Sequence, residues 1–334
     1  WTNAALDSTT YATSETGTAI TNLFDEADPN KSSSEPGEVT WLSRSNWVAT
    51  FPTQPVVLNA TQTLADHLAF TRYDGSKADS VEMPTLGADN GLALVSMIGA
   101  DYDDPQWDTL LDQLTFNEMV NTITLGFHNT AAAASIGKTA TKDENGPQGL
   151  TAALTGGASA MCYTSEDVMA ATFNVDLIND VGRCIGEDCL AMGYSGLYGP
   201  GINMHRTAYS GRNFEYYSED PFVAGTICAA EVQGIQSKGV YVYLKHVALN
   251  DSETSRRGVN TWLNEQTARE IYLEVADKAI TDGGAWSVMT GFNRWGATWC
   301  GANANLLTGF LRGELGMRGM CITDFSGSSQ YMDL

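Results

Sequence analysis

The stretch Gly319-Met320-Cys321-Ile322-Thr323-Asp324-Phe325-Ser326-Gly327 indicates which fold the chain adopts. A short apolar run bounded by glycines is typical of a buried parallel strand. The run ends at a single carboxylate, Asp324, and the chain then enters a Gly/Ser loop. In a β/α barrel the C-terminal strand tips form the active-site face, so an acid at such a tip is a catalytic candidate. Asp324 could equally cap a following helix, and this stretch alone leaves both roles open.

Similar strand tips recur along the chain from about residue 160 onward. A doubly wound sheet would show the same alternation of helices and strands, but it normally carries a Gly-rich phosphate turn, and the sequence has neither GxGxxG nor a P-loop. The alternation therefore predicts an α/β fold, a (β/α)8 TIM-like barrel with parallel strands. The predicted helices span 166–192, 222–236, 264–280 and 305–315, and the predicted strands span 195–200, 239–244 and 286–292.

The first part of the chain has a different composition. Residues 1–55 are rich in Thr, Ser, Asn and Asp, which is typical of a connector. We expect an irregular N-terminal segment over 1–55, joined to a missing upstream domain, and a barrel domain over 56–334 that is incomplete at its C-terminal end. Within that domain, Thr115-Phe116-Asn117-Glu118 is a capping box that predicts the start of a helix, and 143–150 is predicted to be a polar loop.

Charge limits the classes of partner. Acidic residues number 40 against 18 basic ones, and the formal net charge is −22. Such a surface repels nucleic-acid phosphates and anionic membranes, so we expect neither as a partner and favour a neutral substrate. No stretch reaches the roughly 20 uninterrupted apolar residues that a membrane-spanning helix needs.

The cysteines argue against a metal or redox centre. Six are scattered through the sequence without CxxC spacing, so neither zinc ligation nor a redox motif is supported, and we expect no metal or organic cofactor. Most stand in apolar surroundings and are predicted to be buried. This usage is compatible with a reducing, cytoplasmic compartment, while secretion and surface attachment stay open because the true N-terminus is expected to be absent.

Charged side chains follow the predicted strand tips. Arg212 and Glu215 stand in the loop after residue 200, Lys245 and His246 end the next strand, and Asp324 ends the last one. Because the C-terminal tips of parallel strands meet on one face, we expect these side chains to converge. Cations beside a carboxylate suit a carbohydrate, since sugar hydroxyls bind well to charged hydrogen-bond partners. Three aromatic residues are candidates for stacking on a sugar ring: Trp295, Trp299 and Phe325.

Other roles are open for the same residues. Arg212 and Glu215 could form a structural ion pair at the base of a loop. His246 could be a buried core histidine, and Lys245 could be the Schiff-base lysine of an aldolase-like barrel.

Five blocks of sequence resemble glycoside hydrolase family 3, the β-glucosidase family. They occur in the family's order and spacing over about residues 115–334. The five are Gly199-Pro200-Gly201-Ile202-Asn203-Met204-His205-Arg206, Gly211-Arg212-Asn213-Phe214-Glu215-Tyr216-Tyr217-Ser218-Glu219-Asp220-Pro221, Lys245-His246-Val247-Ala248-Leu249-Asn250 followed by Glu253, Val288-Met289-Thr290-Gly291-Phe292-Asn293, and Ile322-Thr323-Asp324-Phe325.

The resemblance implies a role for each matching residue. Asp324 matches the nucleophile of the family, and Arg212, Lys245 and His246 match the residues that grip the sugar. The sequence after the Lys-His pair resembles the glucosidase and xylosidase branch rather than the N-acetylglucosaminidase branch. In the family an α/β-sandwich domain usually provides the acid/base glutamate, and no match to that domain is found in this sequence. The stretch 42–47 resembles the join between such a domain and the barrel.

Two positions depart from the family's pattern. Asn145 stands where a sugar-binding aspartate usually precedes Gly-Pro, so a charge-assisted contact is lost unless Asp143 or Glu144 supplies it. Phe292 replaces the usual tyrosine, which removes a hydroxyl near the nucleophile. We therefore expect Asn145, Phe292 and Phe325 to line the sugar site together with the cations.

The function that the sequence predicts is a retaining exo-β-glycosidase, most simply a β-glucosidase that forms a glycosyl-enzyme on Asp324. Arg212, Lys245 and His246 are expected to keep Asp324 ionised by their positive charge. Three alternatives stay open: β-xylosidase specificity, a catalytically silent sugar-binding barrel, and an aldolase that uses Lys245.

Overall fold

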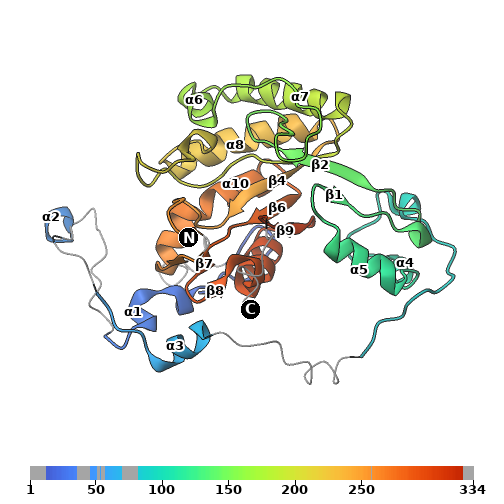
Figure 1. Ribbon diagram of the computed structural model, residues 1–334. Helices are drawn as coiled ribbons and strands as arrows, with labels where there is room; N and C mark the ends of the chain where they lie inside the picture. Colours follow the sequence, from blue (N-terminus) through green and yellow to red (C-terminus); the bar gives the residue numbers. More distant parts are fainter. Residues whose placement is uncertain are drawn as a thin grey trace.

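The computed structural model describes residues 13–35, 46–50, 53, 57–69, 82–256 and 258–325 of the 334-residue chain. These residues form a mixed α/β domain built on a six-stranded sheet (Figure 1). In spatial order its strands are β1 (Asn129–Thr130), β2 (Thr141–Asn145), β3 (Gly196–Tyr198), β4 (Tyr241–Val247), β6 (Ser287–Thr290) and β9 (Cys321–Thr323).

The strands from β2 to β9 are parallel to their neighbours, and only β1 runs antiparallel to β2. Their C-terminal tips therefore lie along one edge, which is the arrangement that the alternating sequence predicts. The described residues form about half of an α/β barrel, and within them the sheet is open rather than closed into eight strands. A second, three-stranded sheet is formed by β5 (Asn260–Thr261), β7 (Arg294–Trp295) and β8 (Thr298–Trp299).

Helices connect the parallel strands. The α-helices are α1 (Pro29–Ser32), α2 (Trp47–Thr50), α3 (Gln62–Leu68), α4 (Gln106–Leu111), α5 (Phe116–Thr124), α6 (Glu166–Ala171), α7 (Val175–Ala191), α8 (Pro221–Gln236), α9 (Glu265–Thr267) and α10 (Glu274–Thr281). Two π-helical segments are η7 (Ala268–Tyr272) and η9 (Asn305–Glu314). The 3₁₀ turns are η1 (Asp25–Ala27), η4 (Leu94–Met97), η5 (Ala134–Ile136), η6 (Asn213–Glu215) and η8 (Cys300–Ala302).

Helices α7 and α8 lie side by side on one face of the sheet, and α10 packs beside α8 (Figure 1). Glycines allow this close approach. An added Cβ at Gly182 would lie 2.4 Å from the carbonyl oxygen of Glu231, and one at Gly234 would lie 2.2 Å from that of Asn179. No larger side chain fits at either position without moving a helix, so the two glycines fix the distance between α7 and α8.

Most of the predicted elements are confirmed, among them helix 222–236, strands 195–200, 239–244 and 286–292, and the strand that leads to Asp324. The capping box at Thr115 is also confirmed, since Glu118 and Thr115 bond reciprocally at the start of α5. Helix 166–192 is two helices instead of one, because Phe173 has φ 51° and Asn174 caps α7.

The prediction of a polar loop over 143–150 is wrong for its first three residues, which belong to β2. The polar residue Asp143 is 1% exposed, but Tyr241 and Tyr243 on β4 donate hydroxyl hydrogen bonds to its carboxylate. These partners come from a strand about 100 residues away in the sequence, so the local polarity of the stretch concealed the strand.

Part of the N-terminal segment packs on the barrel half. The carboxylate of Glu265 accepts hydrogen bonds from the backbone of Leu23 and Phe24, and the Phe24 ring stacks on Trp295 with 3.8 Å between ring centroids. The division of the chain at residue 55 stays a prediction. The stretch 42–47 lies almost wholly outside the described residues.

All six cysteines are free, and three of them, Cys189, Cys228 and Cys300, are buried. The helices in the described part of the chain include none that is both long and apolar enough to cross a membrane.

The close contact of α7 and α8 leads to a stability prediction for Gly234→Ala. Overpacking should cost about 1–3 kcal/mol, which exceeds the roughly 1 kcal/mol that alanine gains over glycine inside a helix. Urea unfolding should therefore give a lower free energy of unfolding. Gly126→Ala is the control, because a Cβ there meets open space, and its change should stay within about 0.5 kcal/mol. Equal stability of the two variants would contradict the close packing.

Candidate active site

A buried carboxylate links two of the predicted site cations. Glu215 is 5% exposed; its Oε1 bonds Arg212 Nε, and its Oε2 lies 3.2 Å from Lys245 Nζ. Burial acts to raise the pKa of Glu215, but Lys245 and Arg212 outweigh it, so the pKa lies below the ordinary value. Glu215 is therefore ionised at neutral pH, and it holds both cations at the tips of neighbouring strands.

The loop that carries Arg212 and Glu215 is tied down by a histidine. His205 Nε2 lies 2.9 Å from the carbonyl oxygen of Asn213 and 2.8 Å from that of Tyr216. Since both neighbours are acceptors, this nitrogen carries a proton and donates to them. His205 thereby holds the turn η6, which contains Glu215 and directly follows Arg212. Its role is structural.

Lys245 and His246 are consecutive residues of β4, and both reach the site. Consecutive side chains of a regular strand point to opposite faces. The pairing register between β4 and β6 shifts between Lys245 and Val247, and such an irregularity changes the direction in which a side chain points. The lysine can thus meet Glu215 while the imidazole meets Asp324.

The imidazole of His246 lies between the last strand and the loop after β3. Its Nε2 is 3.3 Å from Asp324 Oδ2, and its Nδ1 is 3.2 Å from Asn203 Oδ1 and 3.4 Å from the Tyr216 hydroxyl. Burial, followed by the charges of Arg212, Lys245 and Arg256, holds the pKa of His246 well below its ordinary value. The ring is therefore neutral, and the expectation that it contributes a positive charge is wrong.

Asp324 is the carboxylate at the tip of β9. Its backbone N–H donates to the Thr290 carbonyl oxygen at 3.2 Å, and its Oδ1 accepts from the backbone of Phe325 at 2.7 Å. Burial raises the pKa of Asp324, and Arg212, Lys245 and Arg256 only partly offset this. Arg212 and Lys245 act on Asp324 in the expected direction, since both lower its pKa, but desolvation is the larger effect and the pKa lies above its ordinary value.

Two further charged residues border the site and were not predicted as site residues. Glu253 lies 3.8 Å from Arg212 and 2.8 Å from Arg256, and the Arg256 guanidinium sits 4.6 Å from the centroid of the Phe292 ring. Arg256 follows Lys245 in the long polar loop after a strand tip. That position was the one signal in the sequence that could have identified it.

The structure thus brings together Arg212, Lys245, His246 and Asp324. Phe325 follows Asp324 directly; its ring is 58% exposed and lies 5.5 Å from that of Phe127. Phe292 is 5% exposed beneath Arg256.

Asn145 lies at the tip of β2, two strands away from Lys245. Its side-chain amide donates to Glu144 Oε1 at 2.9 Å, and the same Glu144 oxygen lies 3.0 Å from His128 Nδ1. Among the contacts described for this part of the chain, Asn145 joins Glu144 and not the charged cluster. Its role in binding a sugar stays a prediction.

Two aromatic residues proposed for stacking on a sugar belong to the protein interior. Trp295 is 2% exposed and stacks on Phe24, and Trp299 is 7% exposed. Of the three candidates, only Phe325 presents an accessible ring. Composition alone cannot separate a core aromatic from a surface one.

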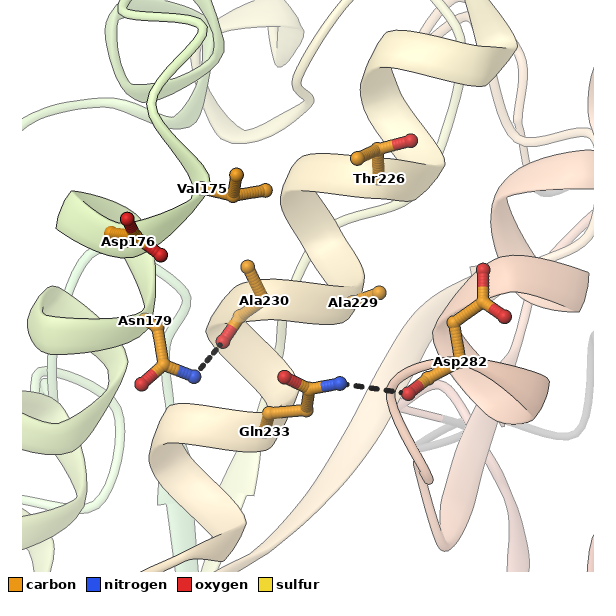
Figure 2. A pocket seen from close by; sticks show the side chains of 8 residues that line it. All are labelled: Val175, Asp176, Asn179, Thr226, Ala229, Ala230, Gln233 and Asp282. Atoms are coloured by element: carbon orange, nitrogen blue, oxygen red, sulfur yellow. Dashed lines mark hydrogen bonds between the residues drawn. The ribbon is translucent and has the colours of Figure 1, made fainter.

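A surface hollow of about 270 Å³ lies on the helical layer, between α7, α8 and the end of α10 (Figure 2). Two of its polar side chains already have backbone partners: Asn179 donates to the Ala230 carbonyl oxygen at 3.0 Å, and Gln233 donates to that of Asp282 at 2.8 Å. These contacts hold the helices together. The charged cluster at the strand tips remains the better candidate for an active site.

Comparison with known proteins agrees with the motifs. Residues 118–333 match the family described as the glycosyl hydrolase family 3 N-terminal domain. The chain is 34% identical over 233 residues to "Beta-glucosidase B" of Emericella nidulans, which covers 69% of this chain and 28% of that protein. It is 34% identical over 190 residues to "Exo-alpha-(1->6)-L-arabinopyranosidase" of Bifidobacterium longum, which covers 54% of this chain and 25% of that protein.

Solved structures of β-glucosidases are also similar to this chain. β-Glucosidase 3B from Thermotoga neapolitana in complex with glucose superposes with a TM-score of 0.60 at 32% identity. The match covers 65% of this chain and 33% of the Thermotoga chain. The chain thus spans about a quarter to a third of the length of these relatives.

The shared carboxylate leads to a prediction for Glu215→Gln. The substitution leaves Arg212 and Lys245 buried without their counter-charge, so it should lower the free energy of unfolding by about 3–5 kcal/mol at neutral pH. The loss should shrink in acid, because the folded-state pKa of Glu215 is lowered and its stabilising charge disappears as pH falls through that pKa.

Glu187→Gln is the matched control, since Glu187 pairs with Lys238 at 2.6 Å and is 61% exposed. It should cost about 1 kcal/mol or less. Urea unfolding across a pH series measures both variants. Equal losses, or a Glu215→Gln loss that does not change with pH, would contradict the buried ion-pair network.

Proposed function

The chain belongs to glycosyl hydrolase family 3, and on that premise we propose that it carries half of the active site of a retaining exo-β-glycosidase. The proposed substrate is a terminal non-reducing β-D-glucosyl residue. The proposed fold of the whole domain is a closed (β/α)8 barrel, of which the described residues form one half. Asp324 is the proposed nucleophile, and the sugar is proposed to bind on the face where the C-terminal strand tips meet.

The observation that carries the proposal is the position of Asp324. Its carboxylate lies at the tip of a parallel strand, 3.3 Å from the neutral His246, within the field of Arg212, Lys245 and Arg256. Asp324 Oδ1 accepts a backbone hydrogen bond, whereas Oδ2 has no hydrogen-bond donor among the described residues. A carboxylate oxygen without a donor, near cations, is well suited to attack an electrophilic carbon.

In the proposed reaction Asp324 Oδ2 bonds to the anomeric carbon while the bond to the leaving-group oxygen breaks and that oxygen takes a proton. Water then releases the sugar with general-base help, so the anomeric configuration is retained. Arg212 and Lys245 donate hydrogen bonds to sugar hydroxyls and so hold the ring in position for attack. The exposed ring of Phe325 is available to cover the apolar face of the sugar.

The acid/base residue is proposed to come from another domain of the same protein, an α/β-sandwich. Retaining chemistry requires a second carboxyl about 5–5.5 Å from the nucleophile, with a raised pKa so that it can donate a proton. Glu215 is the carboxylate nearest to the cations, but its pKa is lowered and both of its oxygens are paired. It is therefore unsuited to protonate a leaving group.

The preference for a glucosyl unit rests on the names of the relatives and on the resemblance of the Lys-His block. An arabinopyranosidase is among the relatives, and β-xylosidase activity is the alternative specificity. Asn145 in place of an aspartate offers the sugar a neutral amide, which weakens any contact relative to a carboxylate. An aldolase is disfavoured, because Lys245 Nζ lies 3.2 Å from Glu215, an ion pair that occupies the nitrogen a Schiff base would require.

Asp324→Ala in the full-length protein tests the nucleophile. Hydrolysis of an aryl β-glucoside should fall by about 10⁴-fold or more. Added azide should restore consumption of an activated substrate and yield the α-glucosyl azide, because a small anion can enter the space that the carboxylate leaves. Asp180→Asn, with its side chain 71% exposed, should keep full activity.

A β-glucosyl azide from the Asp324→Ala variant, or unchanged hydrolysis, would contradict the assignment. A wild-type protein that binds glucose but turns over no β-glycoside would favour the silent-binding alternative.

Arg256→Met tests the electrostatics of Asp324. Arg256 helps to lower the pKa of this carboxylate, so its removal should raise that pKa and move the acid limb of the kcat/KM profile to higher pH. The acid limb should move because the nucleophile must be ionised to react. Arg183→Met, with a 53% exposed side chain, is the control and should leave the profile in place. An acid limb that stays fixed, or moves to lower pH, would contradict the account.

A further inference from the structure

Residues 16–28 lie against the barrel half as a strap that is hydrogen-bonded near both of its ends. Near its start, Thr18 donates its hydroxyl to the Gly313 carbonyl oxygen at 2.9 Å. Near its end, the Ala27 carbonyl oxygen accepts the backbone N–H of Leu263 at 3.1 Å. Both partners belong to the C-terminal part of the chain, so the strap joins segments that are far apart in the sequence.

The middle of the strap is bound by a buried ion-pair network. Glu265 is 5% exposed and accepts the backbone N–H of Leu23 at 3.2 Å and that of Phe24 at 2.7 Å. Arg269 bonds Glu265 at 2.8 Å and reaches Glu314 through two nitrogens. A buried ion pair keeps its geometry because moving one partner leaves the other charge uncompensated. The backbone that carries the Phe24 ring is therefore fixed in position.

The Phe24 side chain supports the three-stranded sheet of β5, β7 and β8. Its ring stacks on Trp295 of β7, with 3.8 Å between the ring centroids and 14° between the ring planes. Both rings are buried. Each strand of this sheet has only two residues, and so small a sheet depends on packing against another element. Phe24 supplies such packing for β7.

The small sheet joins two loops that carry residues of the active site. Strand β7 pairs with β5 in parallel, and the N–H of Gly296 donates to the Thr261 carbonyl oxygen at 2.8 Å. Arg256 stands shortly before β5 and Phe292 shortly before β7, and the guanidinium lies 4.6 Å from the centroid of the ring. The position of the sheet therefore determines where these two side chains meet.

We propose that Phe24 is a positioning residue: through Trp295 and the small sheet, the strap holds Arg256 in place at the border of the active site. This inference rests on the proposed glycosidase function. It gives the N-terminal segment a role in the site, although the strap stands outside residues 118–333, the region that matches the family.

Arg256 acts on the proposed nucleophile through its charge. The ionisable side chains that act on Asp324 are one neutral imidazole and three cations: His246, Arg212, Lys245 and Arg256. The cations lower the pKa of Asp324, and this effect weakens with distance. If the sheet shifts and Arg256 moves away, the pKa of Asp324 should rise.

Glu253 gives the same loop a second tie to the site. It pairs with Arg256 at 2.8 Å and lies 3.8 Å from Arg212. The longer of these contacts exceeds the length of an ordinary hydrogen bond. We therefore expect the small sheet to be the stronger support of Arg256.

The test is Phe24→Ala in the full-length protein, with kcat/KM measured against pH on an aryl β-glucoside. The acid limb should move to higher pH, in the direction expected for Arg256→Met but by a smaller amount. In the double variant the limb should lie where Arg256→Met alone puts it, because both changes act through the same charge. Phe24→Leu keeps an apolar side chain without the aromatic stack, so its limb should lie between those of wild type and Phe24→Ala. It also gives the readout if Phe24→Ala does not fold.

Leu110→Ala is the matched control. Leu110 is 1% exposed and belongs to a separate apolar cluster with Met97 and Ile136. Its truncation should destabilise the protein to a similar extent and leave the acid limb in place. An acid limb that stays fixed in the folded Phe24 variants would overturn the inference, as would a further shift in the double variant relative to Arg256→Met.

Hydrogen exchange separates this inference from the glycosidase proposal. Peptides that cover 258–263 and 294–299 should take up deuterium faster in Phe24→Ala than in wild type, and at the wild-type rate in Leu110→Ala. Unchanged uptake by these peptides in the Phe24 variants would overturn the supporting role of the strap even in an active enzyme. A wild-type protein that turns over no β-glycoside would overturn the glycosidase proposal, while the uptake would still show whether the strap holds the sheet.

Discussion

The site depends on one buried carboxylate that serves two cations. Glu215 comes from the loop after β3, and it binds Arg212 of the same loop and Lys245 of β4. Buried charges are costly unless they are paired, so the three residues must be buried together. Backbone contacts support the pairing, because Lys245 donates to the Pro200 carbonyl oxygen at 3.0 Å and accepts from Ile202. The loop after β3 and strand β4 therefore form one unit, which holds the N–H groups of Arg212 and Lys245 toward the neighbouring strand tips.

Burial acts differently on the groups around this unit. Glu215 stays charged because two cations touch it, whereas the pKa of Asp324 rises and that of His246 falls because desolvation is the larger effect on both. The site thus combines permanent donors, a neutral ring and a carboxylate whose charge depends on pH. A sugar, which is uncharged and carries hydroxyls that both donate and accept, suits such a mixture.

The sequence was sufficient to predict the parallel strands and the convergence of residues at their tips, because apolar runs that end in polar residues are a local signal. It was insufficient for β2, whose buried Asp143 depends on tyrosine hydroxyls from β4. It also misjudged Trp295, whose partner Phe24 is about 270 positions away in the sequence. Contacts between residues that are far apart in the sequence can be recognised only in the three-dimensional structure.

The most direct measurement for the central claim is covalent trapping of the nucleophile. The full-length protein is incubated with a 2-deoxy-2-fluoro-β-glucoside that carries a good leaving group, and labelled peptides are mapped by mass spectrometry. We expect a time-dependent loss of activity with the label on Asp324. A label on a different carboxylate would contradict the assignment of Asp324, and an active protein that hydrolyses β-glucosides without ever taking a label would contradict the covalent mechanism.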